Sequence, residues 1–227
     1  MCKYTSPIES KSRFTILMHP MEHRKEKNGT GHLTALQLVN SEVIVGVDFS
    51  ENDRVNEILT NKEQKSFLVY PGKESFNLSA HSHTAIQKSL GFDVNFFILD
   101  GTWPCAKKML RKSKNLQTLE RVSFDNKVQS KFIIKQQPNS LCLSTIESVY
   151  TILKLLKNSG LEEYDTDNFL LPFEKMIEYQ VECILNPNNE SYCSRKKKRA
   201  VLVRKDNYKK ATQRNIIFEG NIKDTNE

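Results

Sequence analysis

The sequence NFFILDGTWPCAKKML, residues 95–110, joins an apolar run to a helical segment through an aspartate, a glycine and a threonine. The run NFFILD has the apolar and aromatic content of a buried strand, and it ends on Asp100. Thr102 is a residue type that often precedes a helix, and Pro104 fits a first helical turn. The stretch therefore predicts a strand that passes almost directly into a helix, with a carboxylate at the junction.

Other short runs of apolar, β-branched and aromatic residues have the same character, and segments with helical spacing separate them. The predicted strands are residues 13–19, 42–49, 66–71, 94–100 and 119–124, and the predicted helices are residues 31–39, 52–61, 82–90, 103–113, 144–159 and 168–185. This alternation predicts an α/β domain whose mostly parallel sheet carries helices on both faces. Ligands of such sheets bind beyond the carboxyl ends of the strands, so we expect Asp100 to border a binding site.

The composition narrows the class of protein. The 227 residues are 38% hydrophobic, which is enough to fill one core. No run approaches ~18 consecutive apolar residues, and the opening residues MCKYTSPIESKSRF lack the apolar centre of a signal peptide. We therefore expect a soluble cytoplasmic protein without a membrane partner. The five cysteines include no CxxC pair, so we expect no metal site, and we interpret Cys142 and Cys183 as packing residues.

The net charge of +7 comes from one segment near the C-terminus. Residues 195–214 hold ten Lys or Arg and one Asp, whereas the other 207 residues hold 24 basic and 26 acidic side chains. We predict a domain over residues 1–190 and a basic tail over residues 191–227. Such a tail is either a plain solvated segment or a contact for a polyanion, and we favour contact with RNA or DNA.

Four separated segments resemble the DTW-domain family, which is named for an Asp-x-Thr-Trp motif. LDGTWPCAKKMLRKS (99–113) is similar to that motif and the helix after it, and ILMHPMEHRKEKNGTGHL (16–33) resembles the family's His-Pro segment and its following turn. FLVYPG (67–72) and LSTIES (143–148) resemble its Tyr/Phe-Pro turn and its Ser-Thr-x-Glu segment. The four occur in family order, and together they are far more specific than any one of them.

The resemblance implies a tRNA-uridine aminocarboxypropyltransferase. Such an enzyme transfers the 3-amino-3-carboxypropyl group of S-adenosylmethionine, its co-substrate, to N3 of a uridine in tRNA and releases methylthioadenosine. The resemblance also implies a SPOUT-like fold with a trefoil-knotted cofactor region, which general topology rules would not predict. Two departures from the family pattern are visible: of a cysteine-rich zinc element only Cys2 remains, and a family arginine is missing from KFIIKQQP (131–138), where Lys135 is the candidate replacement.

Asp100, Thr102 and Trp103 are the predicted catalytic residues. Attack by uridine N3 requires removal of its proton, so Asp100 is a candidate general base, although a free Asp is a weak one. The alternative is that Asp100 orients the uracil edge or the cofactor's ammonium group. Thr102 and Asp100 together also fit a simple helix cap, and Trp103 fits either a core position or a pocket position where it stacks on a base.

The predicted cofactor-binding residues lie at strand ends and at one helix start, and they are Tyr70, Pro71, Gly72, Leu99, Gly101, Ser144 and Thr145. A plain turn is the alternative for residues 70–72. Ser144 with Glu147 has the spacing of a capping box, and a capped helix start still presents backbone N–H groups to a carboxylate.

The predicted RNA contacts fall in three groups. His19, Asn28 and Thr30 belong to the His-Pro segment and the turn after it, which we expect to shape a pocket wall and expose backbone N–H groups. Lys107 and Arg111 lie four residues apart on the helix after the motif, where a solvated face is the alternative. Lys135, Arg195, Lys196 and Lys197 complete the set.

Three alternatives to tRNA aminocarboxypropyl transfer stay open from the sequence. The same transfer to ribosomal RNA is one, and a non-catalytic RNA-binding protein is the second. The third is an RNA methyltransferase on the same fold, because positioning of the sulfonium selects which carbon reaches the nucleophile.

Overall fold

The computed structural model describes residues 2–25, 29–91, 93–126, 128–134 and 142–185. Within these residues six strands form one sheet, and every pairing in it is parallel. The strands are β1 (Arg13–Met18), β2 (Ser41–Val45), β3 (Lys65–Val69), β4 (Phe76–Asn77), β5 (Val94–Asp100) and β6 (Glu120–Ser123), in the order β2-β1-β5-β3-β6-β4.

β5 lies in the middle of the sheet, with β1 on one side and β3 on the other. Its register pairs Asp100 with Met18 of β1, so the carboxylate lies at the carboxyl end of the central strand. Every residue of β5 is buried except Leu99, which is half-buried. A strand that is covered on both faces favours a continuous apolar run, and the buried Asn95 near its start accepts a hydrogen bond from the hydroxyl of Thr15.

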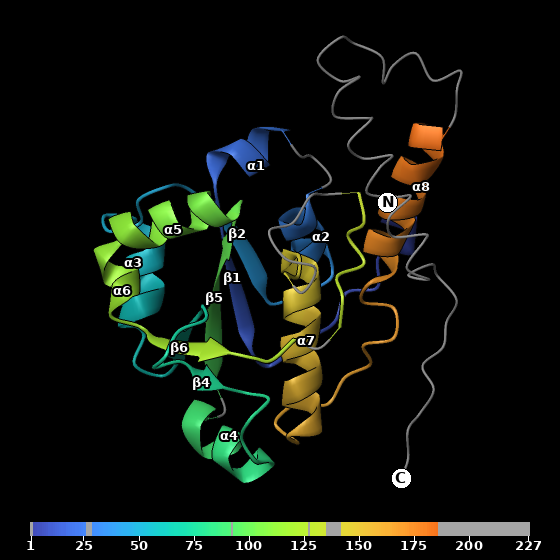
Figure 1. The fold of residues 1–227 in the computed structure, drawn as a ribbon. Coiled ribbons are helices and arrows are strands. Elements are labelled where there is room, and N and C mark those ends of the chain that lie inside the picture. The colour runs from blue at the N-terminus through green and yellow to red at the C-terminus, as the bar shows by residue number, and fades with distance from the viewer. Residues whose placement is uncertain (1, 26–28, 92, 127, 135–141, 186–227) are drawn as a thin grey trace.

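Helices cover both faces of the sheet, as the alternating pattern predicts. The helices are η1 (Cys2–Tyr4, a 3₁₀ turn), α1 (Pro20–Lys25), α2 (Thr30–Leu36), α3 (Asp53–Thr60), α4 (His83–Leu90), α5 (Trp103–Lys112), α6 (Lys114–Gln117), α7 (Thr145–Asn158) and α8 (Leu171–Leu185). Figure 1 shows α3, α5 and α6 on one side of the sheet, α2, α7 and α8 on the other, and α4 at the end opposite α5.

Two apolar clusters flank the sheet, and β5 contributes to both. Phe96 and Ile98 join a cluster with residues of α2, α4, α7 and α8. Phe97 joins a cluster with residues of α3, α5 and α6, and Leu99 packs against it. Successive side chains of a strand point to opposite faces, so one strand fills both cores. The predicted α/β class is therefore confirmed, while the trefoil knot stays a prediction.

Four elements were not predicted, and two predicted strands end at least two residues early. β4 has two residues, and α6 and η1 are single short turns, so none has a periodic pattern. α1 starts at Pro20, whose fixed φ suits a first helical position. The strand predicted over residues 42–49 ends at Val45, and Phe49 instead lies in the second apolar cluster. The strand predicted over residues 66–71 ends at Val69.

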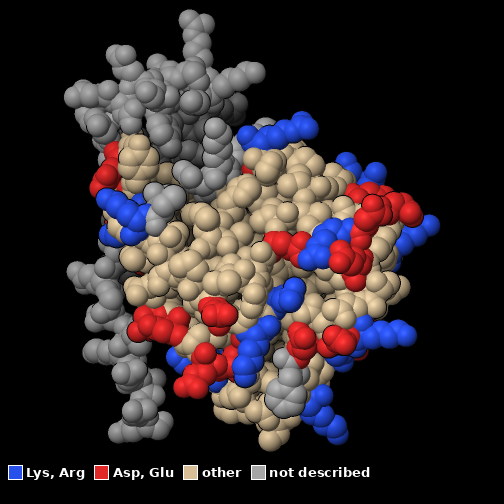
Figure 2. Space-filling model, turned by 180° about the vertical axis from the view of Figure 1, so that it is seen from behind, with Lys and Arg blue, Asp and Glu red and all other residues tan. Residues whose placement is uncertain are grey.

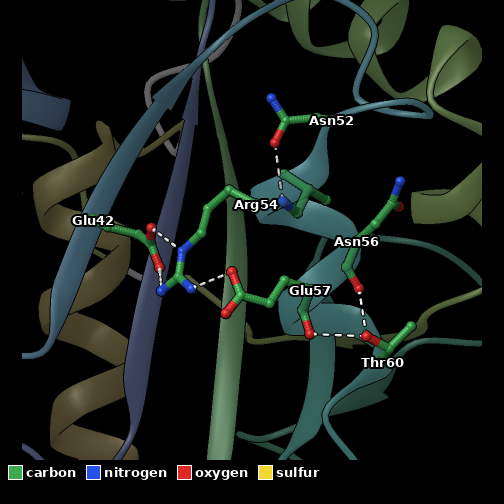
Figure 3. A network of polar contacts seen from close by, with 7 residues as sticks. Glu42, Asn52, Arg54, Asn56, Glu57 and Thr60 are labelled. Atoms are coloured by element: carbon green, nitrogen blue, oxygen red, sulfur yellow. Dashed lines mark hydrogen bonds and ion pairs between the residues drawn. The ribbon is translucent and has the colours of Figure 1, made fainter.

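A surface ion-pair network joins the edge strand β2 to α3 (Figure 3). Nε of Arg54 lies 2.9 Å from a carboxylate oxygen of Glu42, and Nη1 lies 2.8 Å from Glu57. Hydrogen bonds to Glu42 raise the pKa of the Arg54 guanidinium above its ordinary value. Because the side chain of Arg54 is 45% exposed, each pair contributes at most about 1 kcal/mol.

The surface charge is mixed on the face that Figure 2 shows, where acidic and basic side chains alternate over the described residues. That face therefore has no extended zone of one sign. Among the described helices, none is both long enough and apolar enough to cross a bilayer.

Candidate active site

A pocket of about 510 Å³ opens at the carboxyl ends of the central strands. Its walls include the last residues of β3, β5 and β6 with the segments that follow them, namely residues 69–71, 98–104 and 122–124, and residues 142–145 at the start of α7. This is the place where open α/β sheets bind ligands. The motif around Asp100, the Tyr-Pro turn and the Ser-Thr-x-Glu segment therefore meet in one cavity.

Asp100 is the buried carboxylate of this pocket, with 6% of its surface exposed. Oγ1 of Thr145 donates a hydrogen bond of 2.5 Å to Oδ1 of Asp100. The backbone amide of His19 donates to the Asp100 carbonyl at 2.9 Å. Side chain and backbone of Asp100 are thus tied to different elements, which fixes the direction of the carboxylate.

Gly31 allows α2 to approach this carboxylate. A Cβ atom at Gly31 would collide with Oδ2 of Asp100 and would lie 2.7 Å from its Cγ and 2.9 Å from Cε of Met18, closer than real Cβ contacts. Thr30 and Gly31 open α2, so the turn predicted over residues 28–31 is in part helical and the helix begins one residue earlier than predicted. Thr30 is buried and lines the pocket.

Thr102 and Trp103 are exposed at the pocket, and neither fits the simpler interpretation of its sequence. Thr102 is the N-cap residue of α5, as predicted, but its side chain makes no capping hydrogen bond. Thr102 lines the pocket. Trp103 is 46% exposed, so the interpretation of Trp103 as a core residue is wrong.

Trp103 stacks on Tyr70 beside two cations. The two ring centroids lie 5.8 Å apart and the ring planes differ by 5°. Nζ of Lys107 lies 5.6 Å from the Trp103 centroid, and Cζ of Arg121 lies 5.7 Å from the Tyr70 centroid. We call Arg121, Tyr70, Trp103 and Lys107 the aromatic–cationic group.

Ser144 and Glu147 form the predicted capping box of α7. The Ser144 amide donates to Oε2 of Glu147 at 2.8 Å, and the Ser144 hydroxyl donates to the same oxygen at 2.6 Å. Glu147 is 5% exposed and also accepts from the hydroxyl of Ser130 and the amide of Lys131, at 2.8 Å and 2.7 Å. The cap therefore ties the start of α7 to a second segment.

The structure places some of the remaining predicted site residues at or near the pocket, and others lie outside the described residues. Pro71, Leu99 and Gly101 line the pocket. Gly72 lies beside the Arg121 guanidinium, since a Cβ there would lie 3.4 Å from Nη1. His19 is buried, and its Nδ1 accepts the Met21 amide at 3.2 Å. Arg111 is exposed on α5. The predicted contacts Asn28, Lys135, Arg195, Lys196 and Lys197 lie outside the described residues.

No metal site accompanies the pocket within the described part of the chain, where no group of three or more His, Cys, Asp or Glu side chains has a geometry that could hold an ion. The pocket wall is mainly apolar and hydroxyl-bearing, with Asp100 as its buried charge. Such a wall can enclose a small organic molecule that carries positive charge near Asp100.

The family model of the DTW domain matches residues 1–181. The chain belongs to the DTW-domain family. No solved structure matches it.

Three curated relatives of this DTW-domain protein share one name, tRNA-uridine aminocarboxypropyltransferase 2. The relative from Mus musculus is 27% identical over 186 residues, which cover 80% of this chain and 60% of that protein. The relative from Macaca fascicularis is 28% identical over 178 residues (78% and 57%), and that from Drosophila melanogaster 29% over 157 residues (67% and 59%). The chain thus spans about 60% of the length of the curated relatives it matches.

Several residues in or beside the pocket of this DTW domain were not predicted from the sequence. Arg121 lies in β6, and the only available signal was a charged residue inside a predicted strand. Phe124 lines the pocket from a segment without a motif, and Phe132 lines it from KFIIKQQP (131–138), where the sequence pointed to Lys135 instead. Cys142 is exposed and lines the pocket, so its interpretation as a packing residue is wrong.

Proposed function

We propose that this protein transfers the 3-amino-3-carboxypropyl group of S-adenosylmethionine to N3 of a uridine in tRNA. In this reaction a bond forms between N3 and the γ-carbon, the bond from that carbon to sulfur breaks, and N3 loses its proton. The sulfonium becomes the neutral thioether of methylthioadenosine. The family membership and the names of the curated relatives support this reaction class.

The observation that carries the proposal is the hydrogen bond between Thr145 and Asp100 inside the pocket. It joins two of the motif segments that resemble the family, although the two residues are 45 positions apart in the chain. A pair that served only to cap α5 would not need the start of α7 as its partner. The contact therefore supports a shared site rather than two separate caps.

The pocket fits S-adenosylmethionine by size and by charge. Its volume of about 510 Å³ is typical of sites that hold one cofactor-sized molecule. Asp100 provides a buried negative charge, which suits the sulfonium or the ammonium group of that molecule. The start of α7 at Thr145 presents backbone N–H groups, which suit its carboxylate. When bound, the molecule supplies an activated γ-carbon.

Asp100 is the proposed acceptor of the N3 proton. The hydrogen bond that Thr145 donates to Oδ1 orients the carboxylate, and a carboxylate can accept several hydrogen bonds. Thr102, whose side chain makes no capping hydrogen bond, lies on the same wall. Burial of Asp100 limits the access of water to that part of the pocket.

The test of the reaction uses the purified full chain, unmodified tRNA and two preparations of S-adenosylmethionine, one labelled in the methyl group and one in the carboxyl carbon. Carboxyl label in tRNA with methyl label in free methylthioadenosine is the expected result. Methyl label in tRNA would replace the proposal by a methyltransferase. Carboxyl label in ribosomal RNA but not in tRNA would change the substrate and keep the chemistry.

The role of Asp100 is tested by Asp100→Asn, which keeps an oxygen acceptor for Thr145 but cannot take a proton. General-base catalysis is worth about 10²–10⁴-fold, so we expect a loss of at least about 100-fold in single-turnover rate with little change in S-adenosylmethionine affinity. The matched control is Asp167→Asn, at an exposed carboxylate outside the pocket wall. A near-normal rate for Asp100→Asn would assign Asp100 an orienting role instead.

Three finer expectations from the sequence stay predictions: tRNA as the RNA substrate, the cytoplasm as the location, and a knotted cofactor region. We further propose that the basic tail over residues 191–227 contributes to RNA binding, because its charge is suited to phosphates.

A further inference from the structure

The aromatic–cationic group combines an exposed aromatic ring with two neighbouring cations. Trp103 is the only tryptophan of the chain, and 46% of its surface is exposed even though it stacks on Tyr70. Large aromatic side chains usually bury most of their surface, so a stacked pair with one exposed ring at a pocket is a candidate contact surface. Tyr70 and Trp103 both line the pocket, which puts that surface next to Asp100.

The charges beside the rings are both positive. Lys107 lies on α5 one turn after Trp103, and Arg121 lies on β6 beside Tyr70. Among the ion pairs of the described residues, none involves Lys107 or Arg121. Both cations are therefore available to an external anion, and they stand within 6 Å of a ring centroid that can hold a flat group.

A nucleotide of single-stranded RNA has the matching chemistry, since it carries a flat base and a phosphate on each side. We propose that the aromatic–cationic group holds a nucleotide adjacent to the reacting uridine, with its base against the exposed Trp103 ring and its flanking phosphates near Lys107 and Arg121. This inference rests on the proposed function and adds Arg121 and Tyr70 to the RNA contacts. Stacking on an aromatic side chain is sequence-tolerant and raises affinity about 5- to 100-fold per base.

The exposure of Trp103 favours RNA over the adenine of S-adenosylmethionine as the stacked group. A small-molecule site normally buries most of its ligand, and the rings that hold the ligand are buried with it. The inner wall of this pocket is formed by buried residues such as Ile98 and Val122, whereas Trp103 stands at its exposed margin. A macromolecular substrate would cover the exposed face of Trp103 at that margin.

The single tryptophan makes the proposal directly measurable, because all indole fluorescence comes from Trp103. We would titrate the full chain with unmodified tRNA, with S-adenosylmethionine alone and with polyphosphate, correcting each for light absorbed by the ligand. Quenching by tRNA but not by S-adenosylmethionine or polyphosphate is expected. Equal quenching by S-adenosylmethionine would assign the ring to adenine, and no quenching at saturating tRNA would remove the ring from the RNA contact. Equal quenching by polyphosphate would show a charge effect without stacking, and would also overturn the proposal.

Variants separate stacking from charge. Trp103→Ala should weaken tRNA binding about 5- to 100-fold, and Trp103→Phe should restore part of the loss. Lys107→Gln and Arg121→Gln should each reduce the salt dependence of tRNA binding by about one phosphate contact. The matched control is Lys154→Gln, which removes a lysine 5.6 Å from the Tyr150 ring, outside the pocket wall. If Lys107→Gln and Arg121→Gln changed tRNA affinity and its salt dependence no more than Lys154→Gln does, the proposal would be contradicted.

Failure of this inference and failure of the proposed function give different results. If RNA quenches Trp103 and the variants weaken binding while no label reaches RNA, the contact stands and the transfer reaction is wrong. If label reaches RNA at a normal rate in Trp103→Ala and tRNA affinity is unchanged, the reaction stands and the contact is wrong.

Discussion

Gly31 shows how one residue can position the candidate catalytic carboxylate. In most helices Gly→Ala is stabilising by about 1 kcal/mol, because alanine has the higher helix propensity. Here the added methyl group would collide with the carboxylate of Asp100 and with Met18. We therefore expect Gly31→Ala to destabilise the fold by about 1–3 kcal/mol, as overpacking of a buried site does. Urea unfolding measures the change in free energy.

The Gly31→Ala penalty should depend on Asp100. In an Asp100→Ala background the carboxylate is gone, so the same substitution should cost clearly less. This background is the control, because it removes the obstacle and keeps the helix. A penalty of equal size in both backgrounds would assign the crowding to Met18 alone and would separate Gly31 from the active site.

Tyr164 predicts a loss of stability at alkaline pH. Burial raises the pKa of the Tyr164 phenol above its ordinary value of 10.0, with a smaller contribution from the charge of Glu162, and its hydroxyl donates to the Leu153 carbonyl at 2.9 Å. Above pH 10 the unfolded chain releases this proton before the folded chain does, so the stabilisation that is complete below pH 10 declines as pH rises further. Urea unfolding at pH 8 to 11 should show a steeper decline for the native chain than for Tyr164→Phe. An equally steep decline in the native chain and in Tyr164→Phe would contradict this prediction.

Glu147 acts at the scale of elements, because its carboxylate accepts four hydrogen bonds from two segments that border the pocket. Glu147→Gln places an amide N–H₂ among donors and leaves at least one of them unsatisfied. We expect a loss of about 2–4 kcal/mol in unfolding free energy and weaker S-adenosylmethionine binding, because the start of α7 loosens. Calorimetric titration and urea unfolding measure the two effects.

The comparison for Glu147→Gln is Glu163→Gln, at an exposed residue outside the pocket wall. Substitutions at such positions usually change stability by less than about 0.5 kcal/mol. Equal stability of the two variants would mean that the four hydrogen bonds contribute nothing beyond what water supplies to the unfolded chain.

The elements that the sequence predicts well are those with a long, regular pattern. β5 was found because burial on both faces demands a continuous apolar run, and α7 because six of its residues are buried at helical spacing behind a capping box. β4, with two residues, has no pattern that a reader could detect. The helical start at Thr30 was missed because glycines at positions 29 and 31 indicate a turn, and only the approach to Asp100 explains Gly31.

At the scale of the whole molecule, the pocket depends on contacts between distant parts of the chain. The motif around Asp100 could be recognised by resemblance, but its hydrogen bond to Thr145 spans 45 residues and follows from the strand order, which no local pattern encodes. The position of Arg121 beside Tyr70 has the same origin, since β6 pairs with β3 across a long connection. Residue types were therefore predictable, and their juxtaposition was not.

The basic tail gives the last prediction, which concerns the whole chain and its RNA. Residues 195–214 hold ten Lys or Arg and one Asp, and each phosphate contact adds about 0.7–0.9 to the slope of log affinity against log salt. Deletion of residues 195–227 should therefore reduce tRNA affinity and lower that slope by about 2 or more, while S-adenosylmethionine affinity stays unchanged. Filter binding of tRNA between 50 mM and 200 mM salt measures the affinity and the slope. The matched control is deletion of residues 215–227 alone, which keeps the basic run.

Combining the tail deletion with Trp103→Ala tests whether the two contacts are independent. The tail acts through charge and the Trp103 ring through stacking, so their effects on the binding free energy should add within about 0.5 kcal/mol if each contacts a different part of the RNA. An equal slope in the full chain and the tail deletion would mean that the tail does not contact phosphates. A combined loss much smaller than the sum would instead place the tail and the aromatic–cationic group on the same nucleotides, and RNA binding would then depend on one surface rather than two.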